Sequence, residues 1–192
     1  MKKMLLLTIA FFAGLAFGQQ PVQRTQGPLS PPSTPSSLSP LSPPSSPRHS
    51  PSLEFVMQLR VTLGETYTLG TTPQGRRTVV PITGGTFAGE RLRGTILGGG
   101  ADYQLTNGPR TTLEAIYTIR TDDGTYIHVR NRGIIANGTA ADGQPTVYFK
   151  AAPQFEAPTD GPYSWLNDAL FVCEPDFSEH FAGIVLNVWM VK

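Results

Sequence analysis

An aspartate and a tyrosine, Asp102 and Tyr103, follow three consecutive glycines at residues 98–100, with Ala101 between. A carboxyl group beside a cavity can act as a general base, and a phenol can donate a proton or bind an oxyanion. We therefore take Asp102 as a candidate acid–base residue and Tyr103 as a candidate donor, on a loop to which the glycines give conformational freedom. The alternative is that Asp102 caps a turn, as aspartates commonly do.

A second set of candidates follows the turn sequence Thr-Asp-Asp-Gly at residues 121–124. Strand alternation there places Tyr126, His128, Arg130 and Arg132 on one face. If this face lines a cavity, His128 and Arg132 are substrate-binding candidates, because imidazole titrates near neutral pH and guanidinium is cationic. If it faces solvent, as polar faces of antiparallel sheets usually do, these are ordinary surface residues.

Aromatic and amide side chains supply four weaker candidates. Tyr148 is a further possible proton donor, Trp165 a possible aromatic wall of a substrate site, and Asn167 a possible orienting group. Arg76 could hold an anionic substrate group or lie on the surface. Core packing explains the aromatic residues equally well, because tyrosine and tryptophan stabilise cores through their large area.

Several classes of function are disfavoured by the sequence. It contains no phosphate-binding loop, no dinucleotide-binding glycine pattern and no nucleophile elbow. The 3 histidines have no metal-ligand spacing, so we expect neither a metal nor a cofactor. Lys and Arg total 15 against 14 Asp and Glu, without a basic cluster, so we expect no nucleic-acid partner.

These residues must be positioned by strands, because alternation is frequent and helix patterns are scarce. Residues 53–63 and 113–120 alternate regularly, and Asp123-Gly124 predicts a hairpin to a strand at 125–130. Further strands are predicted at residues 77–82, 92–97, 146–150 and 184–191, and a short helix within 163–170. The predicted fold is all-β: a single antiparallel β-barrel with at most one short helix. A β-sandwich is the alternative.

The chain divides into three predicted parts. Residues 1–18 have the two lysines, apolar run and small residues of a secretory signal peptide, and are too short to span a bilayer. Residues 19–52 are rich in Pro and Ser, which predicts a disordered spacer. Residues 53–192 form the domain. We therefore expect secretion or residence in the lumen of the secretory pathway, no stable membrane span, and glycosylation at the Asn137 sequon. The apolar neighbours of the single cysteine, Cys173, favour its burial, and the alternative is a thiol that links two chains.

An ordered set of short motifs in residues 53–192 resembles the DUF3237 family, also called UPF0311. The motifs are Gly-Thr-Thr-Pro-Gln-Gly-Arg-Arg (70–77), Pro-Ile-Thr-Gly-Gly-Thr-Phe (81–87), Gly-Gly-Gly-Ala-Asp-Tyr-Gln (98–104), Thr-Asp-Asp-Gly (121–124), Asn-Arg-Gly (131–133), Tyr-Phe (148–149) and Tyr-Ser-Trp-Leu-Asn (163–167). The resemblance implies a calycin-like β-barrel similar to allene oxide cyclase and dirigent proteins, without a settled activity. Barrels of that type often trimerise, so a homo-oligomer is one expectation.

The sequence departs from the family pattern at two positions. The family often has Trp where this chain has Tyr103, and tends to have Arg where this chain has Ile116. If that arginine lines the family's pocket, the charge of the substrate differs here.

The leading hypothesis is a secreted barrel that binds a small hydrophobic or aromatic molecule and catalyses a cofactor-free cyclisation, isomerisation or elimination. Asp102 would be the acid–base group, with Tyr103 and Tyr148 as donors. Analogy to barrel cyclases supports this only at the level of fold. The alternatives are a non-catalytic carrier that uses the same cavity and a structural surface domain with a filled barrel.

Overall fold

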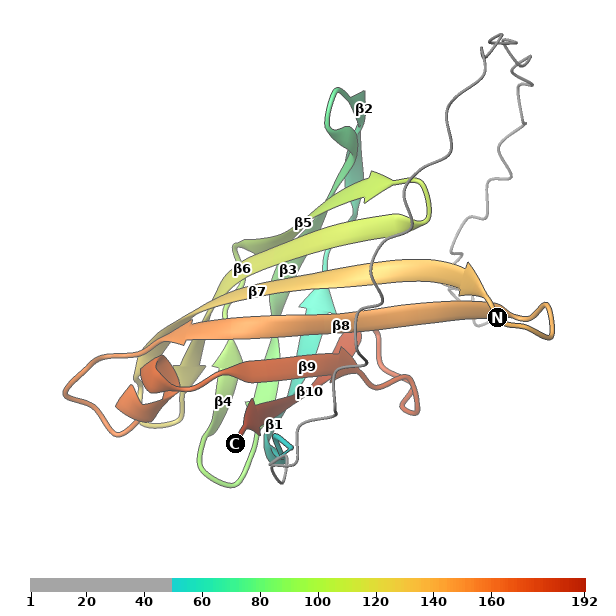
Figure 1. Ribbon diagram of the computed structural model, residues 1–192. Helices are drawn as coiled ribbons and strands as arrows, with labels where there is room; N and C mark the ends of the chain where they lie inside the picture. The colour runs from blue at the N-terminus through green and yellow to red at the C-terminus, as the bar shows by residue number, and fades with distance from the viewer. Residues whose placement is uncertain (1–49) are drawn as a thin grey trace, which may run out of the picture. The chain divides into compact units, whose positions relative to one another are not determined.

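The computed structural model describes residues 50–192, which form a sheet-rich domain (Figure 1). The predicted signal peptide and nearly all of the predicted spacer lie outside the described residues. None of the helices within residues 50–192 is long and apolar enough to cross a membrane.

The domain contains ten strands and one short 3₁₀ helix. In chain order they are β1 (Leu53–Leu63), β2 (Tyr67–Thr72), β3 (Gly75–Ala88), β4 (Arg93–Ile96), β5 (Gly100–Asn107), β6 (Arg110–Thr121), β7 (Tyr126–Thr139), β8 (Pro145–Glu156), η1 (Ser164–Asp168), β9 (Phe171–Pro175) and β10 (Ile184–Val191).

The sheet closes on itself because β1 pairs with both β10 and β3. From β1 the order runs through β10, β9, β8, β7 and β6 to β3. The single strand position between β6 and β3 is filled by β4 and β5, which lie end to end and pair with successive stretches of both neighbours. This arrangement is a closed antiparallel barrel of 8 strands, and β2 forms a hairpin on β3. Closure removes most of the unpaired edges that an open sheet would expose. The predicted barrel is confirmed.

Apolar side chains fill much of the barrel interior. Its fully buried members include Met57 and Leu59 of β1, Ile119 of β6, Ile127 of β7 and Val188 of β10. Barrels of about eight strands have an interior that side chains can fill in this way. The predicted alternation of β1 holds from residue 57 onward, whereas a bulge between residues 55 and 57 buries two consecutive residues near its start.

Seven of the strands lie where the sequence predicts them, with longer bounds for β3, β6, β7 and β8. Three strands were not predicted: β2, β5 and β9. β2 is largely exposed and so lacks apolar alternation, β5 begins with glycine, and β9 has only five residues. The predicted helix is a single 3₁₀ segment, η1, which packs on the core through Leu166.

The strands differ in length, and this leaves one part of the sheet unpaired. β7 and β8 run side by side along their whole length, but β8 pairs with β9 only at Ala151 and Cys173. Figure 1 shows the long strands β7 and β8 extending past the short strand β9. Beyond the end of β9, the residues of β8 before Ala151 are accordingly exposed, apart from the half-buried Phe149.

Candidate functional site

Asp102 lies in strand β5, so the prediction that it sits on a flexible loop is wrong. The strand can start so close to β6 because Gly100 has no side chain. A Cβ atom there would lie 2.5 Å from the carbonyl oxygen of Ile116 and 2.6 Å from the Cβ of Tyr117. Close backbone approach is a common reason for glycine in a strand. The glycine thus fixes the place of Asp102 two residues later.

The Asp102 side chain shares the inner face with its cross-strand partner Ala115, which belongs to the core. Its carboxylate accepts a hydrogen bond from Gln104 Nε2 at 2.7 Å and another from the backbone N–H of Glu114 at 3.1 Å. The β5–β6 register runs from Asp102 to Leu105 and skips the two residues between. The backbone N–H of Glu114 therefore donates to the Asp102 carboxylate in place of a backbone carbonyl of the neighbouring strand.

Burial of the carboxyl group raises the pKa of Asp102 above its ordinary value, although the two hydrogen bonds oppose the rise. Desolvation disfavours the charged form, and hydrogen bonds to the carboxylate favour it. Here desolvation is the larger effect. A raised pKa makes the carboxylate a stronger base than an ordinary aspartate, which suits it to accepting a proton from a substrate.

Further polar groups surround Ala115 on the inner face. Ala115 pairs with Asn131 on the side opposite Asp102, and Tyr117 is the next inward residue of β6. The Asn131 amide donates to the sulfur of Cys173 at 3.4 Å. We call Asp102, Gln104, Tyr117, Asn131 and Cys173 the inner polar cluster.

Tyr117 has an unusual environment within the inner polar cluster. Among the buried side-chain N and O atoms of residues 50–192, its hydroxyl is the one without a hydrogen-bond partner. Burial raises the pKa of Tyr117, so the phenol stays protonated and can donate. Burial likewise raises the pKa of the Cys173 thiol to about 11, which makes it a poor nucleophile at neutral pH. Cys173 is buried, as predicted.

Tyr103 and Arg132 lie on the outer face of the barrel, opposite to Asp102. They contribute to a groove of about 340 Å³ over strands β3, β5, β6 and β7. We call it the outer groove, and its lining is Arg77, Tyr103, Leu105, Thr112, Leu113, Glu114, Arg132 and Gly133. The structure thus brings Tyr103 and Arg132 together but separates both from the carboxyl group of Asp102.

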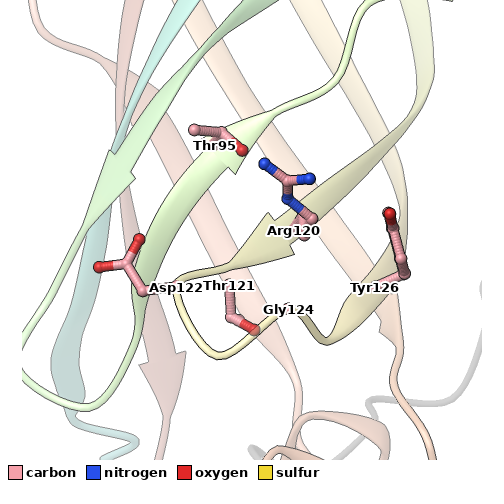
Figure 2. A pocket seen from close by; sticks show the side chains of 6 residues that line it. All are labelled: Thr95, Arg120, Thr121, Asp122, Gly124 and Tyr126. Atoms are coloured by element: carbon pink, nitrogen blue, oxygen red, sulfur yellow. The ribbon is translucent and has the colours of Figure 1, made fainter.

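His128 also lies on the outer face, between β6 and β8, where it pairs with Thr118 and Glu156. Beyond it a second outer pocket of about 260 Å³ is lined by Thr95, Arg120, Thr121, Asp122, Gly124 and Tyr126. Figure 2 shows the Arg120 side chain between Thr95 and Tyr126, the residues with which it pairs across the sheet. The predicted face from residue 126 to 132 therefore faces outward.

The remaining candidates lie apart from the inner polar cluster. Tyr148 is exposed on β8, and Trp165 packs against Phe171 with the Arg91 guanidinium 3.6 Å from its ring centroid. Asn167 is exposed. Its side chain accepts a hydrogen bond from the N–H of Ala157 and donates one to the carbonyl of Ala157, so holding this loop accounts for the asparagine without a substrate.

Two polar candidates lie at the ends of strands. Arg76 is exposed near the start of β3. Asn137 is exposed in β7 rather than in a loop.

Sequence reasoning missed three members of the inner polar cluster: Gln104, Tyr117 and Asn131. The signal for Asn131 was available, because alternation from Ile127 and Val129 places it on the apolar face. Tyr117 occupies an apolar position and resembles an ordinary core tyrosine. Among residues 50–192, no group of three or more His, Cys, Asp or Glu side chains is placed to hold a metal ion.

Comparison with known proteins places the domain in a family. The family model described as "Protein of unknown function (DUF3237)" matches residues 51–191. A UPF0311 protein of Rhodopseudomonas palustris is 33% identical over 156 residues, which cover 74% of this chain and 99% of the relative.

Solved structures agree on the fold. A β-barrel-like protein of Acinetobacter baumannii has a TM-score of 0.66 and 30% identity, over 78% of this chain and 100% of that one. An enzyme from Penicillium herquei has a TM-score of 0.61 and 24% identity, over 77% and 99% of the two chains, and its likeness concerns the fold.

Proposed function

Because the chain belongs to the DUF3237 family of β-barrel proteins, we propose that it binds a small molecule at the inner polar cluster. Asp102 is then the acid–base group of a cofactor-free isomerisation, elimination or cyclisation. One observation supports this more than any other: an inward carboxyl group whose burial raises its pKa. Perturbed carboxyl groups of this kind are concentrated at functional sites.

The simplest reaction of such a site is an allylic proton shift in an unsaturated ketone. The Asp102 carboxylate takes a proton from the carbon beside the carbonyl, and the electron pair of that C–H bond forms an enolate. The same carboxyl group then returns the proton to the distal carbon of the double bond. Atoms and electrons balance without a further reactant, and the product is the conjugated isomer.

The neighbours of Asp102 support this proposal. The hydroxyl of Tyr117 has a hydrogen bond to give, and a phenol that stays protonated stabilises an enolate oxygen. Tyr117 is the next inward residue beyond the cross-strand partner of Asp102 on β6, and such diagonal neighbours are about 7–8 Å apart. The Gln104 amide holds the carboxylate in place at 2.7 Å.

The test uses the full chain and 3-cyclohexenone as the probe in deuterated water. We expect the protein to accelerate conversion to the conjugated ketone, as seen by NMR, with protium rather than deuterium at the distal carbon, because the carboxyl group returns the proton that it took. Asp102→Asn should reduce the rate to that of buffer, whereas Asp160→Asn, a loop aspartate, should not. Equal rates for Asp102→Asn and the unaltered protein would refute the acid–base role. Binding without conversion would favour the non-catalytic carrier.

The raised pKa can be tested without a substrate. A folded-state pKa above the ordinary value of about 3.9 means that stability is lost as the pH rises through the folded pKa. Asp102→Asn carries no charge and escapes that loss. We expect its melting temperature to exceed that of the unaltered protein at pH 7, with the difference shrinking toward pH 3. A difference that is constant with pH would contradict burial of the charge.

We also propose that the protein is exported, which rests on the lysines, apolar run and small residues of positions 1–18. N-terminal sequencing of protein recovered from the culture medium should then begin at Gln19. Retention of Met1 in cell-associated protein would contradict export.

A further inference from the structure

The outer groove has features of a binding site that the proposed reaction does not use. Its volume of about 340 Å³ lies in the range of small-molecule sites, roughly 300–1,000 Å³. Leu105 and Tyr103 supply apolar surface, and Arg77 and Arg132 lie on different strands at its sides. The groove therefore combines apolar contact area with two cationic groups.

The single carboxylate of the groove, Glu114, is already paired with two arginines. One oxygen of Glu114, Oε1, accepts a hydrogen bond from Arg130 Nε at 2.6 Å and another from Arg132 Nε at 2.7 Å. These bonds hold the pKa of Glu114 below its ordinary value, so it stays ionised and paired. Both bonds use Nε atoms, and Arg132 makes no other hydrogen bond to a side chain or backbone group of residues 50–192. Its terminal nitrogens remain available as donors.

Arg77 adds a second cationic group to the groove. Within residues 50–192 its side chain makes neither an ion pair nor a hydrogen bond. Arg77 pairs with Leu105 across the sheet, so its guanidinium lies beside the apolar part of the groove. The groove is thus lined by two arginines and one glutamate, and Arg130 outside the lining also pairs with that glutamate, so the local charge is positive.

We propose that the outer groove binds the carboxylate of a small aromatic acid, with Arg77 and Arg132 as its anion-binding residues. Guanidinium groups match a carboxylate with two parallel N–H donors, which a point charge cannot do. Tyr103 and Leu105 contact the ring of the ligand. This site lies on the face of β5 opposite Asp102, so it is separate from the proposed reaction.

The test measures binding of benzoate to the full chain by titration calorimetry, with benzamide as the neutral isostere and inorganic phosphate as an anion without a ring. We expect benzoate to bind more tightly than either. Backbone amide NMR signals of Tyr103, Leu105 and Thr112 should shift with benzoate. Equal binding of benzamide would overturn the anion site, and equal binding of phosphate would overturn the aromatic acid.

Arginine variants decide where the anion binds. Arg77→Gln should weaken benzoate binding about fivefold or more, because a charge-assisted hydrogen bond is lost. Arg77→Lys keeps the charge but loses the paired N–H donors of the guanidinium, so its affinity for benzoate should lie between those of the unaltered protein and Arg77→Gln. The matched control is Arg120→Gln, which removes an arginine from the other outer pocket. A loss with Arg120→Gln as large as with Arg77→Gln would overturn the proposal. A melting curve for each variant verifies that it is folded.

Discussion

The two faces of strands β6 and β7 differ sharply in what they do. The inner face carries Leu113, Tyr117 and Ile119 of β6 and Ile127 and Val129 of β7, all of them buried. The outer face carries an ion-pair network, the outer groove and the second outer pocket. Because successive residues of a strand point to opposite faces, one stretch of sequence builds both.

The difference shows where stability and function are separated in this barrel. Apolar burial on the inner face contributes most of the stability, since each buried side chain is worth about 1.5–3 kcal/mol. Exposed ion pairs on the outer face contribute about 0–1 kcal/mol each. The inner polar cluster departs from this separation, because it places polar groups on the inner face, where apolar side chains would make the protein more stable.

The largest loss of stability should come from shortening a buried apolar side chain on the inner face. Ile119→Ala removes a side chain with 0% exposure and should lower the free energy of unfolding by about 2–5 kcal/mol, measured by urea denaturation. Ile116→Ala is the matched control, because Ile116 lies on the same strand, faces outward and is only partly buried. Equal losses at the two positions would contradict the assignment of faces.

A smaller loss is expected where β5 meets β6. Gly100→Ala introduces a Cβ atom 2.5 Å from the carbonyl oxygen of Ile116, so the strands must shift, at a cost of about 1–3 kcal/mol. Gly161→Ala is the control, because its added Cβ would meet atoms no closer than 3.6 Å. Denaturation should show Gly161→Ala unchanged or slightly more stable. No loss with Gly100→Ala would mean that this close approach is absent in solution.

A substitution in the inner polar cluster should increase the stability of the protein rather than reduce it. Tyr117→Phe removes a buried hydroxyl without a partner and should raise the free energy of unfolding by about 1 kcal/mol. Tyr163→Phe should instead be slightly destabilising, because the Tyr163 hydroxyl donates to Asp123 at 3.0 Å. Calorimetric melting distinguishes the two. If Tyr117→Phe also destabilises, its hydroxyl has a partner in solution.

The smallest effect is expected on the outer face. Arg130→Gln removes one of the two arginines bonded to Glu114, and Arg132 keeps the carboxylate paired. We expect a loss of about 0.2–1 kcal/mol that shrinks at high salt, as for exposed ion pairs. Urea denaturation at two salt concentrations measures it. A loss above that of Gly100→Ala would show that the network is structurally important.

The sequence by itself determined the strands with apolar alternation and the hairpin at Asp123-Gly124. It also predicted the barrel and the burial of Cys173. Local pattern suffices for these features because a half-buried strand repeats every two residues whatever its partner. β5 and β9 escaped detection because glycine or short length conceals that period.

Only the tertiary structure decided which polar residues meet. Asp102 and Asn131 lie on either side of Ala115 because of the registers of β5, β6 and β7, and the sequence pattern did not reveal β5 as a strand. The same registers place Tyr103 with Arg132 on the outer face, away from Asp102. Adjacent residues such as Asp102 and Tyr103 suggest a shared site in the sequence, but the pleat of a strand sends them to opposite faces.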